Sequence, residues 1–147
     1  MATARWSRTA DTMADIRRVT DDFSVAPQLS PEDMATAAAQ GFKLIVNNRP
    51  DGEAPGQPTS TAMAEAAHAA GLAYVHIPVS GMARPDQVTA MHAALAEAGG
   101  PALAFCRSGT RSITTWAIGE ATTGSRPAPE IVELAGEAGY DLSPLLR

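Results

Sequence analysis

The sequence predicts a single α/β domain with a mainly parallel central sheet of four to five strands flanked by helices. Two observations lead to this prediction. Short apolar runs of strand length alternate along the chain with longer segments of helical composition, which is typical of a parallel sheet buried between helices. The 147 residues contain neither an internal repeat nor a low-complexity linker, so one domain is the simplest organisation.

The N-terminal segment is expected to lie outside this domain. Residues 1–14 carry basic side chains without a following apolar segment, so they predict a flexible tail rather than a secretory signal. The domain is then expected to span residues 15–147. No apolar stretch approaches the roughly 18 residues that span a membrane. A cytoplasmic location is therefore expected.

The first elements of the domain are a strand or hairpin and a helix. The segment "IRRVTDDFSV", residues 16–25, predicts the strand or hairpin. Ser30, Pro31 and Asp33 mark a helix start, because a serine caps the helix, a proline suits its first position and an acid suits the exposed amides. Gly41 is expected to end this helix.

The rest of the chain continues the alternation, with glycines or prolines at most boundaries. Strands are expected at residues 42–48, 72–79 and 102–105, and helices at residues 59–70, 85–98, 111–123 and from Pro127 or Pro129 to Gly139.

Three polar segments follow three of these strands. They read "NRPDGE", "SGMARPDQ" and "CRSGTR". Because ligands of open α/β sheets bind beyond the carboxyl ends of the strands, these segments are expected to meet in space. Arg49, Asp51, Ser80 and Asp86 are the candidate residues for the rim of the resulting site.

The segment "CRSGTR" predicts a reactive thiol. Cys106 is the only cysteine, which excludes an intrachain disulfide. A lone cysteine is often only a small buried apolar side chain, but here two arginines and a glycine follow it. A loop entering a helix can aim several N–H groups at one point, which holds an anion and lowers the pKa of a thiol. Cys106 is therefore expected to be the nucleophile and Arg111 a charged donor, with an anion cradle formed by Arg107, Ser108, Gly109, Thr110 and Ser112.

The loop and the chain around it resemble two related groups of proteins. The loop resembles the C-R-x-G-x-[RT] active loop of rhodanese-type sulfurtransferases. The segments "QLSPEDMATAAAQGFKLIVNNRPDGE", "AGLAYVHIPV", "GPALAFCRSGTRS" and "EIVELAGEAGYDL" resemble a bacterial family of small dual-specificity-phosphatase-like domains. Members of that family also occur fused to β-lactamase-like hydrolases and are described as phosphatases or as sulfurtransferases. The resemblance runs from Ile16 to Leu145 and implies a cysteine-phosphatase-like fold.

Three features of the chain depart from the phosphatase pattern that the resemblance implies. Phosphatases carry C-x5-R, whereas four residues separate Cys106 from Arg111 and the arginine position is held by Ser112. The aspartate that protonates the leaving group is expected near Ser80, where "SGM" offers no acid. Phosphatases also usually carry histidine before the cysteine, where this chain has Phe105. A shorter ring of amides suits a sulfur atom on Cys106 better than a phosphate.

These departures favour a rhodanese-like sulfurtransferase without metal or cofactor. In this interpretation Cys106 takes sulfane sulfur from a small anionic donor such as thiosulfate and passes it to cyanide or an external thiol, for which a sulfur-oxidising enzyme is a candidate. The alternative is a tyrosine- or dual-specificity-type phosphatase that uses Asp51 or Asp86 as acid. A non-catalytic module that binds anions or phosphoproteins is the third interpretation. The net charge of −5 gives no basis for nucleic-acid binding, and no membrane partner is expected.

Overall fold

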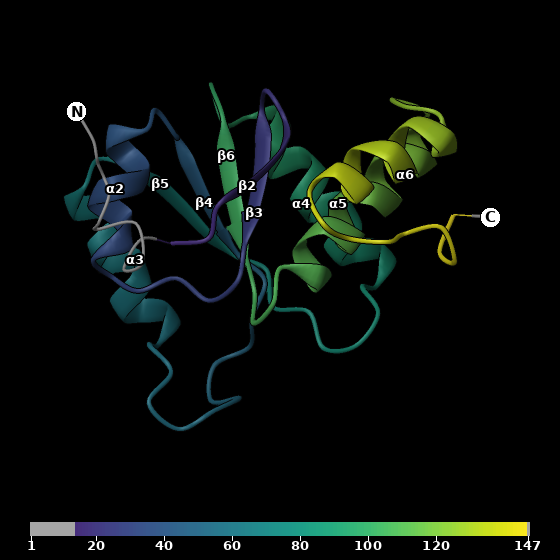
Figure 1. Ribbon diagram of the computed structural model, residues 1–147. Coiled ribbons are helices and arrows are strands. Elements are labelled where there is room, and N and C mark those ends of the chain that lie inside the picture. The colour runs from purple at the N-terminus through teal and green to yellow at the C-terminus, as the bar shows by residue number, and fades with distance from the viewer. Residues whose placement is uncertain (1–13, 147) are drawn as a thin grey trace.

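The computed structural model describes residues 14–146, which form a five-stranded sheet between two layers of helices (Figure 1). The predicted tail, residues 1–14, lies outside the described residues apart from Ala14. The strands are β2 (Arg17–Thr20), β3 (Phe23–Ala26), β4 (Leu44–Asn47), β5 (Ala73–His76) and β6 (Ala102–Phe105). The helices are α2 (Asp33–Ala39), α3 (Ser60–Ala69), α4 (Pro85–Ala96), α5 (Thr110–Thr123) and α6 (Ala128–Glu137).

The sheet has the order β2-β3-β6-β4-β5, which confirms the predicted α/β class. Strands β2 and β3 form an antiparallel hairpin, and the other three pairs of neighbours are parallel. Strand β6 lies at the centre, with Leu103 opposite both Ser24 and Ile45. The parallel strands therefore end at the same edge of the sheet, so the loops that follow them can meet there.

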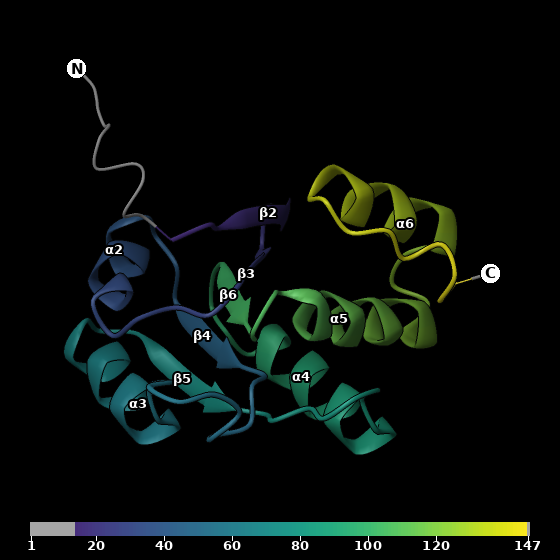
Figure 2. The ribbon, with the colours of Figure 1, turned by 60° about the horizontal axis from the view of Figure 1, so that its bottom comes forward.

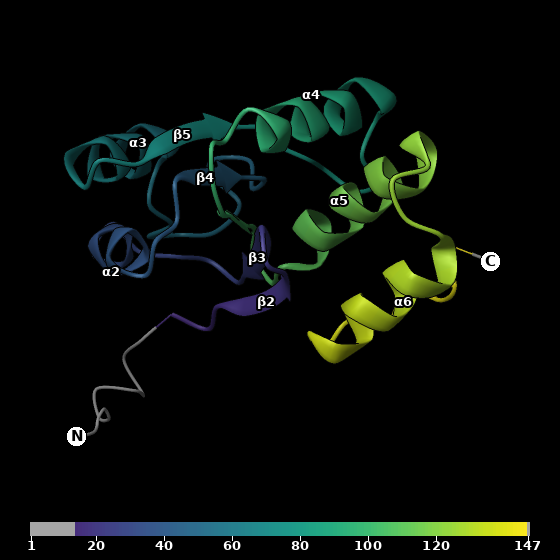
Figure 3. The same cartoon turned by 90° about the horizontal axis from the view of Figure 1, so that it is seen from above.

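Each face of the sheet packs against its own layer of helices. Figure 3 shows α2 and α3 over one face and α4, α5 and α6 over the other. Because side chains alternate along a strand, Ala102 and Ala104 of β6 pack toward the second layer, whereas Leu103 and Phe105 pack toward the first. Figure 1 shows β6 flanked by strands on both sides, in agreement with its fully apolar sequence.

The predicted start of the first helix is correct in its contacts but two residues too early in its position. The Ser30 N–H donates to Asp33 Oδ2 at 2.7 Å, and the Asp33 N–H donates back to Ser30 Oγ at 3.3 Å. These reciprocal bonds close a turn over residues 31–32, and regular helix begins only at Asp33. The strand predicted at residues 102–105 has the bounds of β6, and the other predicted elements differ at their ends by a few residues, where local pattern gives the weakest signal.

None of the helices in residues 14–146 is long and apolar enough to cross a membrane.

The centre of the sheet is expected to be the most sensitive point of the fold. Leu103 is fully buried in β6. Replacing it by alanine removes apolar contacts and leaves a cavity, so Leu103→Ala is expected to lower the free energy of unfolding by about 2–5 kcal/mol, measured by urea titration. Met82→Ala is the control, because that side chain is 62% exposed, and it should change stability by less than about 0.5 kcal/mol. Equal effects of the two substitutions would contradict this description of the core.

Candidate functional site

The loop between β6 and α5 places a buried thiol at the start of a helix. Figure 2 shows the chain passing from β6 into α5 through this loop. Cys106 follows β6 directly and is 0% exposed. Its Sγ accepts the N–H of Gly109 at 3.1 Å. Gly109 has a φ of 91°, which favours glycine, and it precedes the first residue of α5, so the positive end of the helix dipole lies beside the sulfur.

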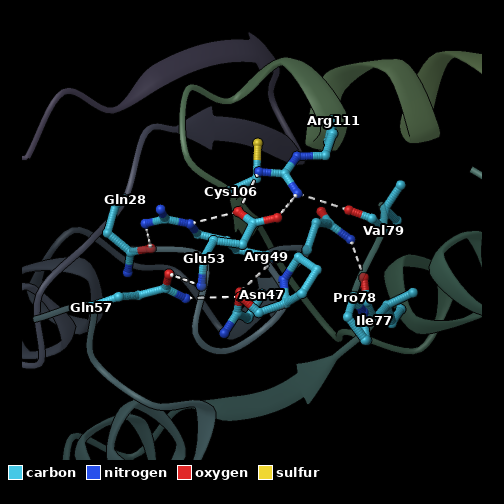
Figure 4. A network of polar contacts seen from close by, with 12 residues as sticks. Gln28, Asn47, Arg49, Glu53, Gln57, Ile77, Pro78, Val79, Cys106 and Arg111 are labelled. Carbon is cyan, nitrogen blue, oxygen red and sulfur yellow. Dashed lines mark hydrogen bonds and ion pairs between the residues drawn. The ribbon is translucent and has the colours of Figure 1, made fainter. Parts of the chain in front are cut away.

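Arg111, in the first turn of α5, is held along one edge of its guanidinium group. Nη1 donates to Glu53 Oε2 and to the Val79 carbonyl, both at 2.8 Å, and Nη2 donates to Glu53 Oε1 at 2.9 Å. The opposite edge carries Nε–H and the second N–H of Nη2. Figure 4 shows the Cys106 sulfur and the Glu53 carboxylate on either side of this group. The hydrogen bond with Glu53 raises the pKa of Arg111, and the interaction with Cys106 raises it further, while burial opposes both.

Glu53 lies between two arginines. Besides Arg111, it accepts Nε–H of Arg49 at 2.9 Å, and Arg49 Nη1 donates to Gln28 Oε1 at 3.0 Å. The Arg49 side chain is only 5% exposed. Hydrogen bonds from Arg111 and then Arg49, with the charges of both, lower the pKa of Glu53 to about 2, although burial opposes the shift. Glu53 is therefore an ionised carboxylate within the site.

Glu53 is the residue that the sequence-based prediction missed. It belongs to "NRPDGE", the segment after β4 in which Arg49 and Asp51 were the predicted rim residues. Two signals could have identified it, namely its spacing of four residues from Arg49 and its place at the carboxyl edge of the sheet.

The predicted cradle residues lie in different places around the loop. Ser112 is fully buried, and its hydroxyl donates to Asn48 Oδ1 at 2.8 Å, so it is turned toward the core. Ser108 Oγ donates to Thr110 Oγ1 at 3.0 Å on the exposed side. Arg107 is exposed, and its carbonyl accepts the N–H of Gln28 at 3.3 Å. Of the predicted cradle, the Gly109 amide is the group with a hydrogen bond to the sulfur.

The two predicted rim aspartates are engaged in contacts at helix starts, whereas Arg49 lies within the site. Asp51 Oδ1 accepts the N–H of Ser60 at the start of α3 at 2.8 Å. Asp86 lies in the first turn of α4 and pairs with Arg84 at 3.1 Å, and the hydrogen bond from Arg84 lowers its pKa. Ser80 is exposed and follows Val79, whose carbonyl accepts from Arg111. Arg49 therefore pairs with Glu53, whereas Asp51 and Asp86 make contacts at the starts of α3 and α4.

The charge distribution of the site suits an anion. Arg49 and Arg111 both reach the loop edge, and one carboxylate, Glu53, lies between them. Within residues 14–146 there is no group of three histidine, cysteine or acidic residues that could hold a metal ion. His76, the histidine of β5, contacts the Arg49 carbonyl through Nε2 at 2.8 Å.

Comparison with known proteins identifies the family to which the chain belongs. Residues 15–123 match the family model described as beta-lactamase hydrolase-like protein, phosphatase-like domain. A beta-lactamase hydrolase-like protein of Agrobacterium fabrum is 40% identical over 131 residues, which are 88% of this chain. A protein with the same description from Xylella fastidiosa is 34% identical over 84% of this chain. The chain spans about 30% of the length of these relatives.

Two solved structures of similar fold are a proposed phosphatase and a protein bound to phosphotyrosine. A proposed phosphatase from Neisseria meningitidis has a TM-score of 0.79 and 31% identity, covering 89% of this chain and 93% of the other. A tyrosine-phosphate complex of Pseudomonas aeruginosa TpbA has a TM-score of 0.62, covering 92% and 85%; at 15% identity it shows the fold alone. The buried cysteine loop lies within the matched residues, and the chain belongs to the family of phosphatase-like domains of beta-lactamase hydrolase-like proteins.

Proposed function

We propose that the chain is a cysteine-dependent phosphatase that acts on phosphate monoesters. The observation that supports this most directly is the arrangement at Cys106, whose Sγ lies at the N-terminus of α5 with the Gly109 amide and the Arg111 guanidinium beside it. Such groups stabilise a thiolate and the charge of a bound phosphate. The family description and the proposed phosphatase of Neisseria meningitidis support the same reaction class.

The proposed reaction proceeds through a phosphocysteine. The Cys106 thiolate attacks phosphorus, an S–P bond forms, and the P–O bond to the leaving alcohol breaks with its electron pair staying on oxygen. Water then attacks phosphorus, a new P–O bond forms, and the S–P bond breaks with its electron pair returning to the Cys106 sulfur, so that the thiolate is restored and the phosphate leaves with the protons of the water. The N–H of Gly109 and the edge of Arg111 that faces away from Glu53 stabilise the negative charge of the phosphoryl oxygens.

The state of the carboxylates at the carboxyl edge of the sheet limits which leaving groups the site can release. Glu53 has a pKa of about 2, so it carries no proton at neutral pH. Asp86 is paired with Arg84, and Asp51 accepts a hydrogen bond at the start of α3. An alkoxide needs a proton in order to leave, whereas a phenolate is stable enough to leave without one. We therefore infer that the substrates are aryl phosphates.

Sulfur transfer is the second candidate, and the length of the loop favours it. Four residues separate Cys106 from Arg111, and Ser112, at the arginine position of C-x5-R, is turned into the core. In this reaction the thiolate attacks the outer sulfur of thiosulfate, the S–S bond breaks, and sulfite leaves with the bonding electrons without needing a proton. The persulfide sulfur then passes to an acceptor outside the chain, because Cys106 is the only cysteine.

The comparisons favour the phosphatase over the sulfurtransferase that the sequence predicted. The family model is described as phosphatase-like and the Neisseria meningitidis structure as a proposed phosphatase, and none of the relatives reported above is described as a sulfurtransferase. The sulfur donor, the thiol acceptor and the cytoplasmic location stay predictions.

A paired assay of wild type and Cys106→Ser separates the two candidates. Wild type is expected to hydrolyse para-nitrophenyl phosphate, and Cys106→Ser to lose at least about 10³-fold in kcat/KM, because the nucleophile is removed. Thermal unfolding checks that the variant is folded. Thiocyanate formation from thiosulfate and cyanide is measured beside it. Thiocyanate without phosphate release would replace the first candidate by the second, and inactivity in both assays would contradict both.

The leaving group provides a separate test of the proposed substrate class. Hydrolysis of para-nitrophenyl phosphate is expected to exceed that of glycerol phosphate by at least about 10²-fold in kcat/KM, because general acid catalysis contributes 10²- to 10⁴-fold. Phosphate release is measured for both esters under the same conditions. Similar rates would show that a proton donor acts in the site and would contradict the inference that the substrates are aryl phosphates.

The stabilising effect of Glu53 is expected to depend on pH. Because its pKa is lowered from 4.5 to about 2, its contribution is present above about pH 5 and lost as the pH falls toward 2. Glu53→Gln should therefore lower the free energy of unfolding by about 1–2 kcal/mol at neutral pH and by less near pH 3. Urea titrations at both values measure this. Glu65→Gln, an exposed change on α3, is the control, and a deficit independent of pH would contradict the ion pair.

A further inference from the structure

One peptide group of the loop is held at both ends. The N–H of Gly109 donates to Cys106 Sγ at 3.1 Å, and the carbonyl of Ser108, in the same peptide group, accepts the hydroxyl of Tyr140 at 2.9 Å. In a trans peptide the N–H and C=O point in opposite directions. A single peptide plane therefore joins the thiol on one side to Tyr140 on the other.

Tyr140 is itself fixed by the segment after α6 and by β2. Its N–H donates to the Ala135 carbonyl of α6 at 2.8 Å. The guanidinium of Arg17 lies 5.4 Å from the centre of the Tyr140 ring, and its Nη1 donates to the Ala138 carbonyl at 3.3 Å. Figure 1 shows the end of α6 turned toward β2 and β3. The Tyr140 hydroxyl thus contacts the loop between β6 and α5 from a ring whose position is fixed by these contacts.

The contact with Gly109 is close enough to depend on glycine. A β-carbon at this position would collide with the Tyr140 hydroxyl. The φ of 91° is also one that glycine adopts readily and that other residues rarely adopt. Glycine, however, offers little resistance to rotation of its peptide group. Rotation would turn the Ser108 carbonyl, the negative end of the peptide dipole, toward the sulfur.

The Tyr140 hydroxyl opposes this rotation because it holds the carbonyl from outside. The pKa of Tyr140 is raised, and burial of the phenol is the largest cause of this shift. The charge of Arg17 lowers the pKa, whereas the charges of Cys106 and Asp15 raise it. The phenol therefore keeps its proton and remains a hydrogen-bond donor at neutral pH.

We propose that Tyr140 is a positioning residue, which fixes the Ser108–Gly109 peptide so that its N–H faces the sulfur of Cys106. This inference rests on the proposed role of Cys106 as the nucleophile. Tyr140 lies outside residues 15–123, the part of the chain that the family model matches. The C-terminal segment after α6 is thus part of the thiol site.

Tyr140→Phe tests this role, because it removes the hydroxyl and keeps the ring. The ultraviolet absorbance of the thiolate is titrated against pH, with Cys106→Ser in the same background as the blank, which is possible because the chain has one cysteine. The midpoint is expected to move upward by about 0.5 to 1 pH unit, since the loss of one hydrogen bond weakens the hold on the peptide. The kcat/KM for para-nitrophenyl phosphate should fall about three- to tenfold.

Tyr74→Phe is the matched control. The Tyr74 hydroxyl is also hydrogen bonded, to Asn47 Nδ2 at 3.0 Å and to Ser60 Oγ at 2.8 Å. This variant should lose stability without moving the thiolate midpoint. Arg17→Gln is a second variant, which keeps the hydroxyl but loosens the ring, and it should move the midpoint in the same direction by less.

Two results would overturn the proposal. The first is an unchanged midpoint in folded Tyr140→Phe, and the second is an equal change in Tyr74→Phe. The titration needs no substrate, so it is independent of the proposed reaction. A shifted midpoint in a protein without phosphatase activity would retain Tyr140 as a positioning residue and contradict the proposed function alone.

Discussion

The Glu53 carboxylate joins three loops of the carboxyl edge into one site. It follows β4, it pairs with Arg111 at the start of α5, and Arg111 in turn donates to the Val79 carbonyl after β5. Because Glu53 binds one edge of the guanidinium, the other edge remains for the thiol and for an incoming anion. Arg49, nearly buried, holds the far side of the same carboxylate. Without this ion pair, the flexible Arg111 side chain would keep only the hydrogen bond to the Val79 carbonyl and would be less firmly oriented.

The thiol loop adds a second layer of positioning that comes from the backbone. The Gly109 amide can face the Cys106 sulfur only in one orientation of its peptide group, and glycine alone does not impose that orientation. Tyr140 supplies the missing constraint from the segment after α6. The contacts of Arg49 and Arg111 with Glu53 fix the positions of charged groups. The contact of Tyr140 with the Ser108 carbonyl fixes the direction of a peptide dipole. Both act on the same small volume around the sulfur, where preorganised groups contribute most to catalysis.

Phosphoryl and sulfur transfer share this machinery because both begin with a thiolate and an anion. The two reactions differ in the leaving group. An alkoxide requires a proton, whereas sulfite and phenolates do not, and Glu53 is ionised at neutral pH. Under the proposed function, the site therefore suits leaving groups that are stable as anions. The relatives favour phosphate as the substrate group, while the four-residue spacing between Cys106 and Arg111 favours a smaller one.

The sequence alone determined the α/β class and the thiol loop, because these follow from local pattern. The apolar run at residues 102–105, the lone Cys106 and the glycine after it are neighbours in the chain. Only the tertiary structure decided that Glu53 pairs with Arg111, 58 residues away, and that Tyr140 reaches Ser108, 32 residues away. It also decided that Ser112 faces the core. Such contacts leave no spacing signal, because they depend on the order of parallel strands and on how α5 and α6 pack against the sheet.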